Sequence, residues 1–486
     1  MRRLWTMIMA AIFISLISFS VEAASDGKGI YLKYCASCHG IEGKGNGPAS
    51  EFLLPRPRNL TDGVYKWRTT SFDDYYPSEE DIFNTIKNGL AGTSMPGWAD
   101  VLNDNDIRSL VKYLKDLAGL ENPEKGKINI PSSFPSGTES IENGKALFKE
   151  RCVECHGKQG RGDSLKRLKD DWGFLTVPRD FSKQWTFRAG SSPKDVYARI
   201  GIGIPGTQMP SYDDPENKKR LSDEEKIDVA NYVSSLARPD IRPTGDNVVR
   251  AKRVKGPLPE AFNNTLWEKS PYANFYVFPQ FFSGERLFTP TLDSISVRAL
   301  YNEKEIAFLL EWHDPVKSVP GDKRSKELSG EEPFEDSIAL EFPVEARSWF
   351  GMGDEAKGVI IWQWKSGGVN ALQKTRVIGY KGPSKAIEKE PIVKAFGEYE
   401  DGAWRVIMKS PLKADSIEFK AGEFMPIAFA AWDGSNAERG ARHVMTGWNW
   451  VSLEEDAGWK KVFFPLAIFI FILVFEIIVM RGVRKG

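Results

Sequence analysis

All four cysteines of the chain lie in two copies of one short pattern. Residues 35–39 read Cys-Ala-Ser-Cys-His, and residues 152–156 read Cys-Val-Glu-Cys-His. Two thiols at this spacing can add to the two vinyl groups of one haem, and the adjacent histidine places an imidazole against the iron. A zinc site or a redox pair is the alternative for C-x-x-C, but the histidine in both copies favours covalent haem. The predicted thioether residues are Cys35, Cys38, Cys152 and Cys155, and the predicted iron ligands are His39 and His156.

The similarity between the two copies extends beyond the cysteines. A glycine and an aromatic residue stand eight and four positions before the first cysteine, which places all three on one helix face. A methionine followed by proline comes 56 residues after the first motif histidine and 53 after the second. These residues are Gly27, Tyr31 and Met95 in the first copy, and Gly144, Phe148 and Met209 in the second. A terminal helix is predicted in each copy, over 104–117 and 222–236.

This order of helix, C-x-x-C-H, loop, Met-Pro and terminal helix resembles class I cytochrome c. The resemblance covers residues 26–120 and 139–237, and it implies two all-α domains that each hold one haem c. It also implies that Met95 and Met209 are the sixth ligands of the two irons, where a thioether raises the reduction potential. The alternative is that these methionines only fill the core.

Two arginines occupy related places in the copies, each after a segment rich in proline and arginine. Arg68 follows Trp67 directly, and Arg188 lies three residues after Trp185. Because a guanidinium pairs well with a carboxylate, we expect Arg68 and Arg188 to contact haem propionates. The alternative is that both are ordinary surface arginines.

The composition changes after the second copy. Segments 121–138 and 238–260 are rich in small and polar residues and in proline, and they are predicted to be linkers. From 261 to 455, short β-rich runs alternate with turns, which predicts an all-β antiparallel sandwich. The predicted strands cover residues 294–300, 306–312, 337–342, 359–364, 404–409 and 427–432.

Motifs in this region resemble the haem-b-binding subunit of ethylbenzene dehydrogenase and related molybdenum enzymes. They are Trp-His-Asp-Pro at 312–315, Phe-Glu-Asp-Ser at 334–337, Phe-Gly-Met-Gly at 350–353 and Trp-Asp-Gly at 432–434. The resemblance implies one haem b with a methionine ligand, which maps to Met352. The family's second ligand is described as a lysine near the end of the domain, where this sequence instead has His443. A neutral imidazole is a good iron ligand, so His443 is the predicted partner of Met352.

Two alternatives remain for this domain. The chain has only four histidines, and two are assigned to haem c, so His313 competes with His443 as the ligand. Alternatively, His443 is a surface residue, and the sandwich is a haem-free module that binds carbohydrate or a partner protein.

Both ends of the chain carry membrane signals. Two arginines, an apolar stretch and small residues near Ala23 predict a signal peptide over 1–23. Residues 462–480 are almost continuously apolar, which predicts a C-terminal transmembrane helix, and the basic residues of 481–486 predict a cytoplasmic tail. The predicted fold class is therefore multidomain: two all-α cytochrome c domains, an all-β antiparallel sandwich and one transmembrane anchor. The body is expected on the periplasmic side of the cytoplasmic membrane.

The residue types point to electron transfer and not to substrate chemistry. Lysine plus arginine (66) equals aspartate plus glutamate (66), so the chain lacks the positive excess typical of nucleic-acid binding. No Ser/His/Asp set and no phosphate loop is evident. The resemblance implies a molybdopterin catalytic subunit and an iron–sulfur subunit as partners, with onward transfer to a periplasmic or membrane carrier. The combination of domains looks most like the gamma subunit of a membrane-bound nitrite oxidoreductase. The alternative is a cytochrome c subunit of another dehydrogenase or an oxidase.

Overall fold

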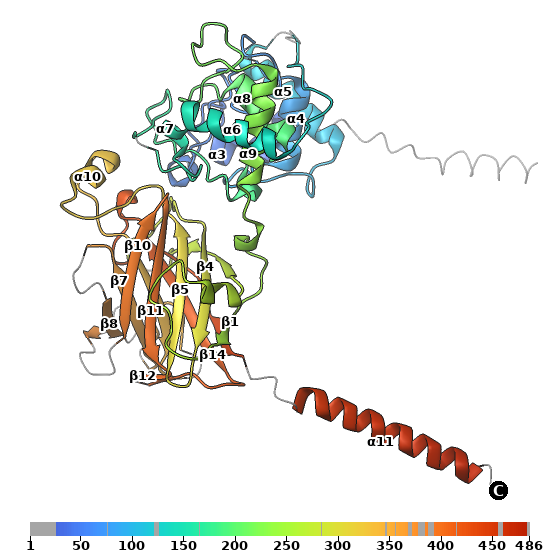
Figure 1. Ribbon diagram of the computed structural model, residues 1–486. Coiled ribbons are helices and arrows are strands. Elements are labelled where there is room, and N and C mark those ends of the chain that lie inside the picture. The colour runs from blue at the N-terminus through green and yellow to red at the C-terminus, as the bar shows by residue number, and fades with distance from the viewer. Residues whose placement is uncertain are drawn as a thin grey trace, which may run out of the picture. The chain divides into compact units, whose positions relative to one another are not determined.

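The structure is a computed structural model, and it describes residues 26–74, 76–120, 126–164, 166–282, 284–345, 348–354, 356–367, 372–377, 384–386, 393–414, 416–454 and 460–483. The predicted signal peptide lies outside these residues. The chain forms two compact units (Figure 1). Unit 1 comprises Met1–Cys152, Leu168–Thr176 and Gln184–Ala237, and unit 2 comprises Val153–Arg167, Val177–Lys183 and Arg238–Gly486.

Unit 1 is helical and contains most of both repeat copies. Its helices are α2 (Gly27–Tyr34), α3 (Ala36–His39), α4 (Glu79–Asn88), α5 (Asp104–Ala118), α6 (Thr138–Arg151), α8 (Pro193–Ile202) and α9 (Asp223–Ser235). Four of them begin with a complete capping box. In this motif, the N-cap side chain accepts a hydrogen bond from the main-chain N–H three residues later, and the side chain of that later residue accepts one from the N-cap main-chain N–H. These N-cap residues are Ser78, Asn103, Ser192 and Ser222.

The repeated glycine explains how the first and last helices of each copy cross. A Cβ at Gly27 of α2 would overlap the main-chain oxygen of Ser109 in α5, and a Cβ at Gly144 of α6 would overlap that of Asp228 in α9. One turn after the glycine, the aromatic residue that both copies share packs against a tyrosine of the last helix of its copy. The ring centroids of Tyr31 and Tyr113 are 5.3 Å apart, as are those of Phe148 and Tyr232. Glycine is therefore required for the close approach that lets these rings pack.

Unit 2 is built on a β-sheet whose hydrogen-bonded strand order is β10-β11-β5-β4-β1-β16-β14-β6-β7-β8-β9. These strands are β1 (Val248–Arg253), β4 (Ser294–Tyr301), β5 (Glu305–His313), β6 (Ser337–Pro343), β7 (Val359–Lys365), β8 (Leu372–Val377), β9 (Ser384–Ala386), β10 (Lys394–Glu400), β11 (Ala403–Pro411), β14 (Phe424–Trp432) and β16 (Asn449–Leu453). The short strands β2 (Ala273–Tyr276), β3 (Phe278–Pro279) and β15 (Val444–Met445) pair beside this path. Unit 2 also contains α7 (Val153–His156), which carries the end of the second C-x-x-C-H motif.

Most strand pairs are antiparallel, as predicted, but β1 departs from this pattern. It runs parallel to both β4 and β16. Because β1 lies within residues 238–260, this proline-containing segment contributes a strand to the sheet.

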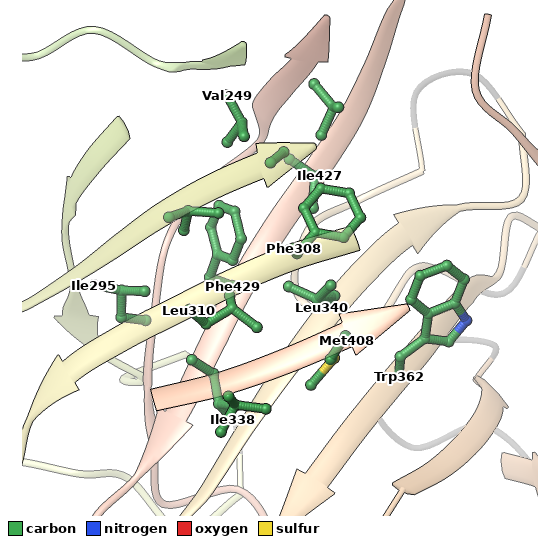
Figure 2. Packing of buried hydrophobic residues seen from close by; sticks show 14 of the residues in the cluster. Val249, Ile295, Phe308, Leu310, Ile338, Leu340, Trp362, Met408, Ile427 and Phe429 are labelled. Carbon is green, nitrogen blue, oxygen red and sulfur yellow. The ribbon is translucent and has the colours of Figure 1, made fainter. Parts of the chain in front are cut away.

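Side chains from the two halves of the sheet meet in one core (Figure 2). Trp364 of β7 packs edge-on against Trp404 of β11 with ring centroids 4.9 Å apart, although these strands are not neighbours. Likewise, Phe275 of β2 stacks on Phe429 of β14 at 5.0 Å. The two halves therefore pack face to face, and burial of each large ring contributes roughly 2–3 kcal/mol.

The predicted C-terminal transmembrane helix is wrong. Helix α11 spans Lys460–Val483, but no helix in the described part of the chain is both long and apolar enough to cross a bilayer. Residues 484–486 of the predicted cytoplasmic tail lie outside the described residues.

Candidate haem sites

The first cytochrome segment of unit 1 surrounds a cavity of about 460 Å³. All four residues predicted to attach and ligate the first haem line it: Cys35, Cys38, His39 and Met95. The remaining walls are largely apolar and come from α2, α4, α5 and the loop before α4, with Tyr31, Ile82, Ile86, Leu110 and Leu114 among them. The residues that would bond the porphyrin thus share one apolar cavity, as haem requires.

The imidazole of His39 is oriented by the main chain. Its Nδ1 lies 3.0 Å from the carbonyl oxygen of Arg58, which favours a proton on Nδ1 and leaves Nε2 for iron. Burial lowers the pKa of His39 below its ordinary value, although the hydrogen bond to Arg58 opposes this shift. A neutral imidazole is the form that coordinates a metal.

The methionine loop has the same construction in both copies. Met95 N–H donates to Thr93 Oγ1 at 3.1 Å, and Leu90 N–H donates to the carbonyl of Met95 at 3.1 Å. In the second copy, Met209 N–H donates to Thr207 Oγ1 at 3.2 Å, and Ile204 N–H donates to the Met209 carbonyl at 3.1 Å. The two methionines therefore lie in main-chain hairpins of the same construction.

Two buried polar atoms on the first cavity's wall lack a protein partner. Nη2 of Arg58 and the hydroxyl of Tyr65 are both buried without a hydrogen-bond partner among the described residues. Burial lowers the pKa of Arg58 to about 10, so its guanidinium remains charged at neutral pH. Buried donors of this kind are rare, and both suit the carboxylates that a haem brings. The residues present therefore fit a covalently bound haem.

The first cavity also has walls from the second copy. Asp170, Trp172 and Phe174 lie on its lining, and the Trp172 ring lies 3.7 Å from the Arg58 guanidinium carbon. The same segment contacts the second methionine loop, because Asp171 N–H donates to the Gly206 carbonyl at 3.1 Å. Sequence reasoning missed this segment, because contacts between repeats leave no periodic signal.

The two arginines predicted to contact propionates lie in different surroundings. Arg68 is buried and donates to the carbonyl oxygens of Thr70 and Phe72 at 2.8 and 3.2 Å, and it is not on the cavity lining. Arg188 does line the cavity, with its guanidinium carbon 5.9 Å from the Trp67 ring centre. The propionate contact of Arg188 remains a prediction, and Arg58 joins it as a candidate.

The second C-x-x-C-H motif is divided between the two units. Cys152 belongs to unit 1, and residues 153–156 belong to unit 2. In unit 1, Cys152 N–H donates to the Phe148 carbonyl at 2.9 Å. In unit 2, the His156 ring stacks on Phe181 with centroids 4.7 Å apart. Burial lowers the pKa of His156 to about 4, which keeps its imidazole neutral.

In unit 2, the two residues predicted to ligate haem b line one small cavity. Met352 and His443 both border it, together with Gln280, Phe282, Glu341 and Trp432. His443 lies beside the end of β14, where its ring packs 4.8 Å from that of Trp432. His313 is not on this cavity, and its Nε2 instead contacts the carbonyl oxygen of Arg161.

His443 has the orientation expected of a ligand. Its Nδ1 lies 3.0 Å from the Gly440 carbonyl, and its own carbonyl accepts from Gln280 N–H at 2.9 Å. Burial lowers the pKa of His443 to about 4, so the ring is neutral and Nε2 is available.

Met352 sits in a strained loop next to a buried carboxyl. Its φ of 70° lies in the left-handed region, and the loop is closed by Gly353 N–H donating to the Trp349 carbonyl at 2.8 Å. Burial raises the pKa of Glu341 well above its ordinary value, although a hydrogen bond with the Met352 main chain opposes this. Oε1 of Glu341 is buried and has no hydrogen-bond partner among the described residues. The sequence analysis did not identify Glu341 as a residue of this site, because it appears in the sequence only as part of the predicted strand 337–342.

The donor chemistry fits haem b, but the space does not in this conformation. The cavity holds about 20 Å³, roughly the room for one water molecule. One residue of the cavity lining, Phe282, belongs to a group of neighbouring aromatic side chains. These aromatics form a contiguous cluster of Phe278, Phe281, Phe282, Trp349 and Phe350, in which Phe281 is 57% exposed.

Comparison with protein families assigns three segments of the chain. Residues 22–114 match the family of cytochrome c oxidase, cbb3-type, subunit III, and residues 141–237 match cytochrome c. Residues 264–377 match the ethylbenzene dehydrogenase family. The chain thus contains two cytochrome c domains and a segment of the ethylbenzene dehydrogenase type. The two cytochrome c matches imply two covalently bound haems c, and the roles of the individual residues of the two C-x-x-C-H motifs stay predictions.

Several curated relatives match part of the chain. The chain is 26% identical over 215 residues to chlorate reductase subunit gamma of Ideonella dechloratans, a match that covers 42% of this chain and 84% of the relative. It is 27% identical to dimethylsulfide dehydrogenase subunit gamma of Rhodovulum sulfidophilum, over 30% of this chain and 56% of the relative. It is 30% identical to thiosulfate dehydrogenase of Psychrobacter arcticus, over 42% of this chain and 56% of the relative. The chain thus spans little more than half the length of two of these relatives.

Proposed function

We propose that this chain is the electron-transfer subunit of an exported oxidoreductase complex, bound to a molybdopterin catalytic subunit and an iron–sulfur subunit. The single observation that carries the proposal is that one chain joins a 460 Å³ haem c cavity to a β-domain in which Met352 and His443 share a second cavity. Haem supplies an iron that accepts and returns one electron.

The residues of the chain serve to hold and insulate redox groups. His39 and Met95 would ligate the iron of a haem bound in the cavity that they line, and an iron held by both residues would transfer electrons without binding a substrate. The apolar walls exclude water, and buried Arg58 and Tyr65 offer donors to charged edges of the cofactor. Such a site stores and passes electrons without substrate chemistry.

The relatives support the proposed partners. Two of them are named gamma subunits, one of chlorate reductase and one of dimethylsulfide dehydrogenase. We place this chain in the same position in its own complex, on the periplasmic side of the membrane. Among possible substrates of the catalytic partner we propose nitrite, because the combination of two haem c domains with the haem-b-type domain resembles the gamma subunit of nitrite oxidoreductase.

Affinity purification of the tagged chain from its own cells tests the proposal. The isolated complex should contain molybdenum and iron–sulfur iron in addition to haem. Anaerobic addition of nitrite should reduce the haems c. Oxidation of nitrite to nitrate takes its oxygen atom from water and releases two protons and two electrons, and the haems accept the electrons. Dimethyl sulfide serves as the control donor. Purification of the chain without molybdenum would contradict the proposed complex. Haems that remain oxidised after addition of nitrite would contradict nitrite as the substrate.

A second function is favoured by the small size of the unit 2 cavity. The cavity that Met352 and His443 border, about 20 Å³, is much smaller than a porphyrin. The chain would then be a two-haem cytochrome subunit of another dehydrogenase or oxidase, and its β-domain would bind a partner. A haem count separates the two functions.

A further inference from the structure

Three buried aspartates of unit 2 lie at strand ends that the sheet brings together. Asp314 directly follows β5, Asp336 directly precedes β6, and Asp433 directly follows β14. Strands β6 and β14 are antiparallel neighbours, and Trp432 pairs with Ser337, so the start of one meets the end of the other. The exposed fractions of Asp314, Asp336 and Asp433 are 0%, 0% and 1%.

The carboxylates converge on one point. One oxygen from each of the three residues lies within 4.8 Å of those of the other two. Oxygen ligands of a calcium ion lie 2.3–2.6 Å from the metal, so two of them are at most about 5 Å apart. The observed spacing is therefore that of three ligands around one ion.

The cluster is held by neutral donors. The carboxylate of Asp336 accepts from Ser318 N–H at 2.6 Å, Trp404 Nε1–H at 2.8 Å and Gly434 N–H at 2.9 Å. Asp433 accepts from the Thr291 hydroxyl at 2.6 Å and Ser435 N–H at 2.8 Å. These bonds fix the carboxylates in place without cancelling their charge.

One oxygen of the cluster has no protein partner. Oδ1 of Asp314 accepts from Val316 N–H at 3.1 Å, whereas Oδ2 is buried without a hydrogen-bond partner in the described part of the chain. The largest effects of charged groups on Asp314 come from Asp336, Asp433 and Glu438, which are all acidic. A buried, unpaired carboxylate facing other carboxylates is costly, and a cation removes that cost.

Main-chain hydrogen bonds connect the loops that surround the three aspartates. Phe334 N–H donates to the Gly434 carbonyl at 3.2 Å, and a Cβ at Gly434 would overlap the Phe334 carbonyl oxygen. Asp336 N–H donates to the Ser318 carbonyl at 3.2 Å. Three loops thus meet around the carboxylates and keep water away from them.

We propose that Asp314, Asp336 and Asp433 bind one calcium ion that ties together the ends of β5, β6 and β14. Calcium suits this site better than magnesium, because it accepts irregular sets of protein oxygens, whereas magnesium retains several water ligands. The site belongs to the β-domain itself and does not depend on which enzyme the chain serves.

The test uses the full-length haem-containing protein. Elemental analysis after purification should find one calcium per chain, and dialysis against EGTA should remove it. The melting temperature of the β-domain, followed by circular dichroism, should then fall by about 5 °C or more. Calcium chloride should restore it, and magnesium chloride at the same concentration should not.

Two variants make the assignment specific. Asp314→Asn keeps the shape of the side chain and should lower the calcium content at least tenfold. Asp246→Asn removes an exposed carboxylate that pairs with Arg250 on the surface and should retain one calcium. If Asp314→Asn does not fold, the EGTA experiment on the unaltered protein decides. Absence of calcium together with no thermal response to it would overturn the proposal, as would equal rescue by magnesium or full calcium retention in Asp314→Asn.

Discussion

Met352 and His443 are 91 positions apart in the sequence, yet both line the same cavity of the β-domain. The thioether comes from a loop after β6, and the imidazole lies just before β15, which pairs with β14. The antiparallel strands β6 and β14 contribute Glu341 and Trp432 to the same cavity lining, so both segments border one part of the sheet. The third candidate, His313, lies at the end of β5 and contacts the carbonyl of Arg161. This arrangement supports the pairing of Met352 with His443.

The first prediction concerns retention of haem b. His443→Ala should lower the haem b content severalfold and leave both haems c near full occupancy, because haem b has no covalent attachment to replace a lost ligand. His313→Ala is the matched control and should change neither haem. Pyridine haemochrome spectra of the purified variants measure both. Loss of haem b with His313→Ala and its retention with His443→Ala would reverse the assignment.

The second prediction concerns the sixth ligands of the haems c. Met95→Ala and Met209→Ala should each leave the haem attached and reduce the near-infrared band of Met-ligated ferric haem by about half, since the chain has two such sites. Met408→Leu, in the β-domain core, should leave the band unchanged. An undiminished band in either alanine variant would show that its methionine is only a packing group.

The third prediction concerns the helix crossing of the first cytochrome domain. Gly27→Ala should lower the free energy of unfolding by about 2 kcal/mol, because the added methyl group meets the main chain of Ser109. Gly29→Ala lies in the same helix, and its nearest contact would be an ordinary 3.5 Å to Asp26. This control should be neutral or more stable by about 0.5 kcal/mol. Guanidinium unfolding followed by circular dichroism compares the two. Equal stabilities would show that α2 and α5 cross elsewhere.

The fourth prediction concerns Arg58. A buried cation beside a haem disfavours the extra positive charge of ferric iron, so Arg58→Ala should lower the reduction potential of one haem c by on the order of 50 mV, close to a tenfold change in the equilibrium constant. The other haem should keep its potential. Arg108→Ala is the control, because this arginine lies over Phe83 and not on the cavity. Spectroelectrochemical titration resolves the two haems, and two unchanged potentials would contradict the role of Arg58.

The sequence alone predicts those parts of the protein in which binding of a cofactor requires particular residues at a particular spacing. Both C-x-x-C-H motifs and both Met-Pro loops are readable, because covalent attachment and axial ligation demand particular residues at particular places. All six predicted runs in the β-region correspond to observed strands, since half-buried strands show an alternating or β-branched pattern.

The remaining features depend on contacts that sequence patterns do not encode. Strand β1 lies in a segment that was predicted to be a linker because it is rich in proline and polar residues. Its pairing with β4 and β16 shows that it is a strand of the sheet. Trp172 belongs to the second repeat but lines the cavity of the first. The predicted membrane anchor was inferred from apolar composition, and the described part of the chain contains no helix that meets the length and apolarity of a membrane span.

The haem count of the purified full-length protein tests the central claim most directly. Two haems c follow from the two cytochrome c domains, and one haem b follows from the pairing of Met352 with His443. Pyridine haemochrome spectra should therefore show haem c and haem b in a ratio of two to one. Haem c alone, in protein with both haems c fully occupied, would contradict the account and leave the β-domain as a haem-free module.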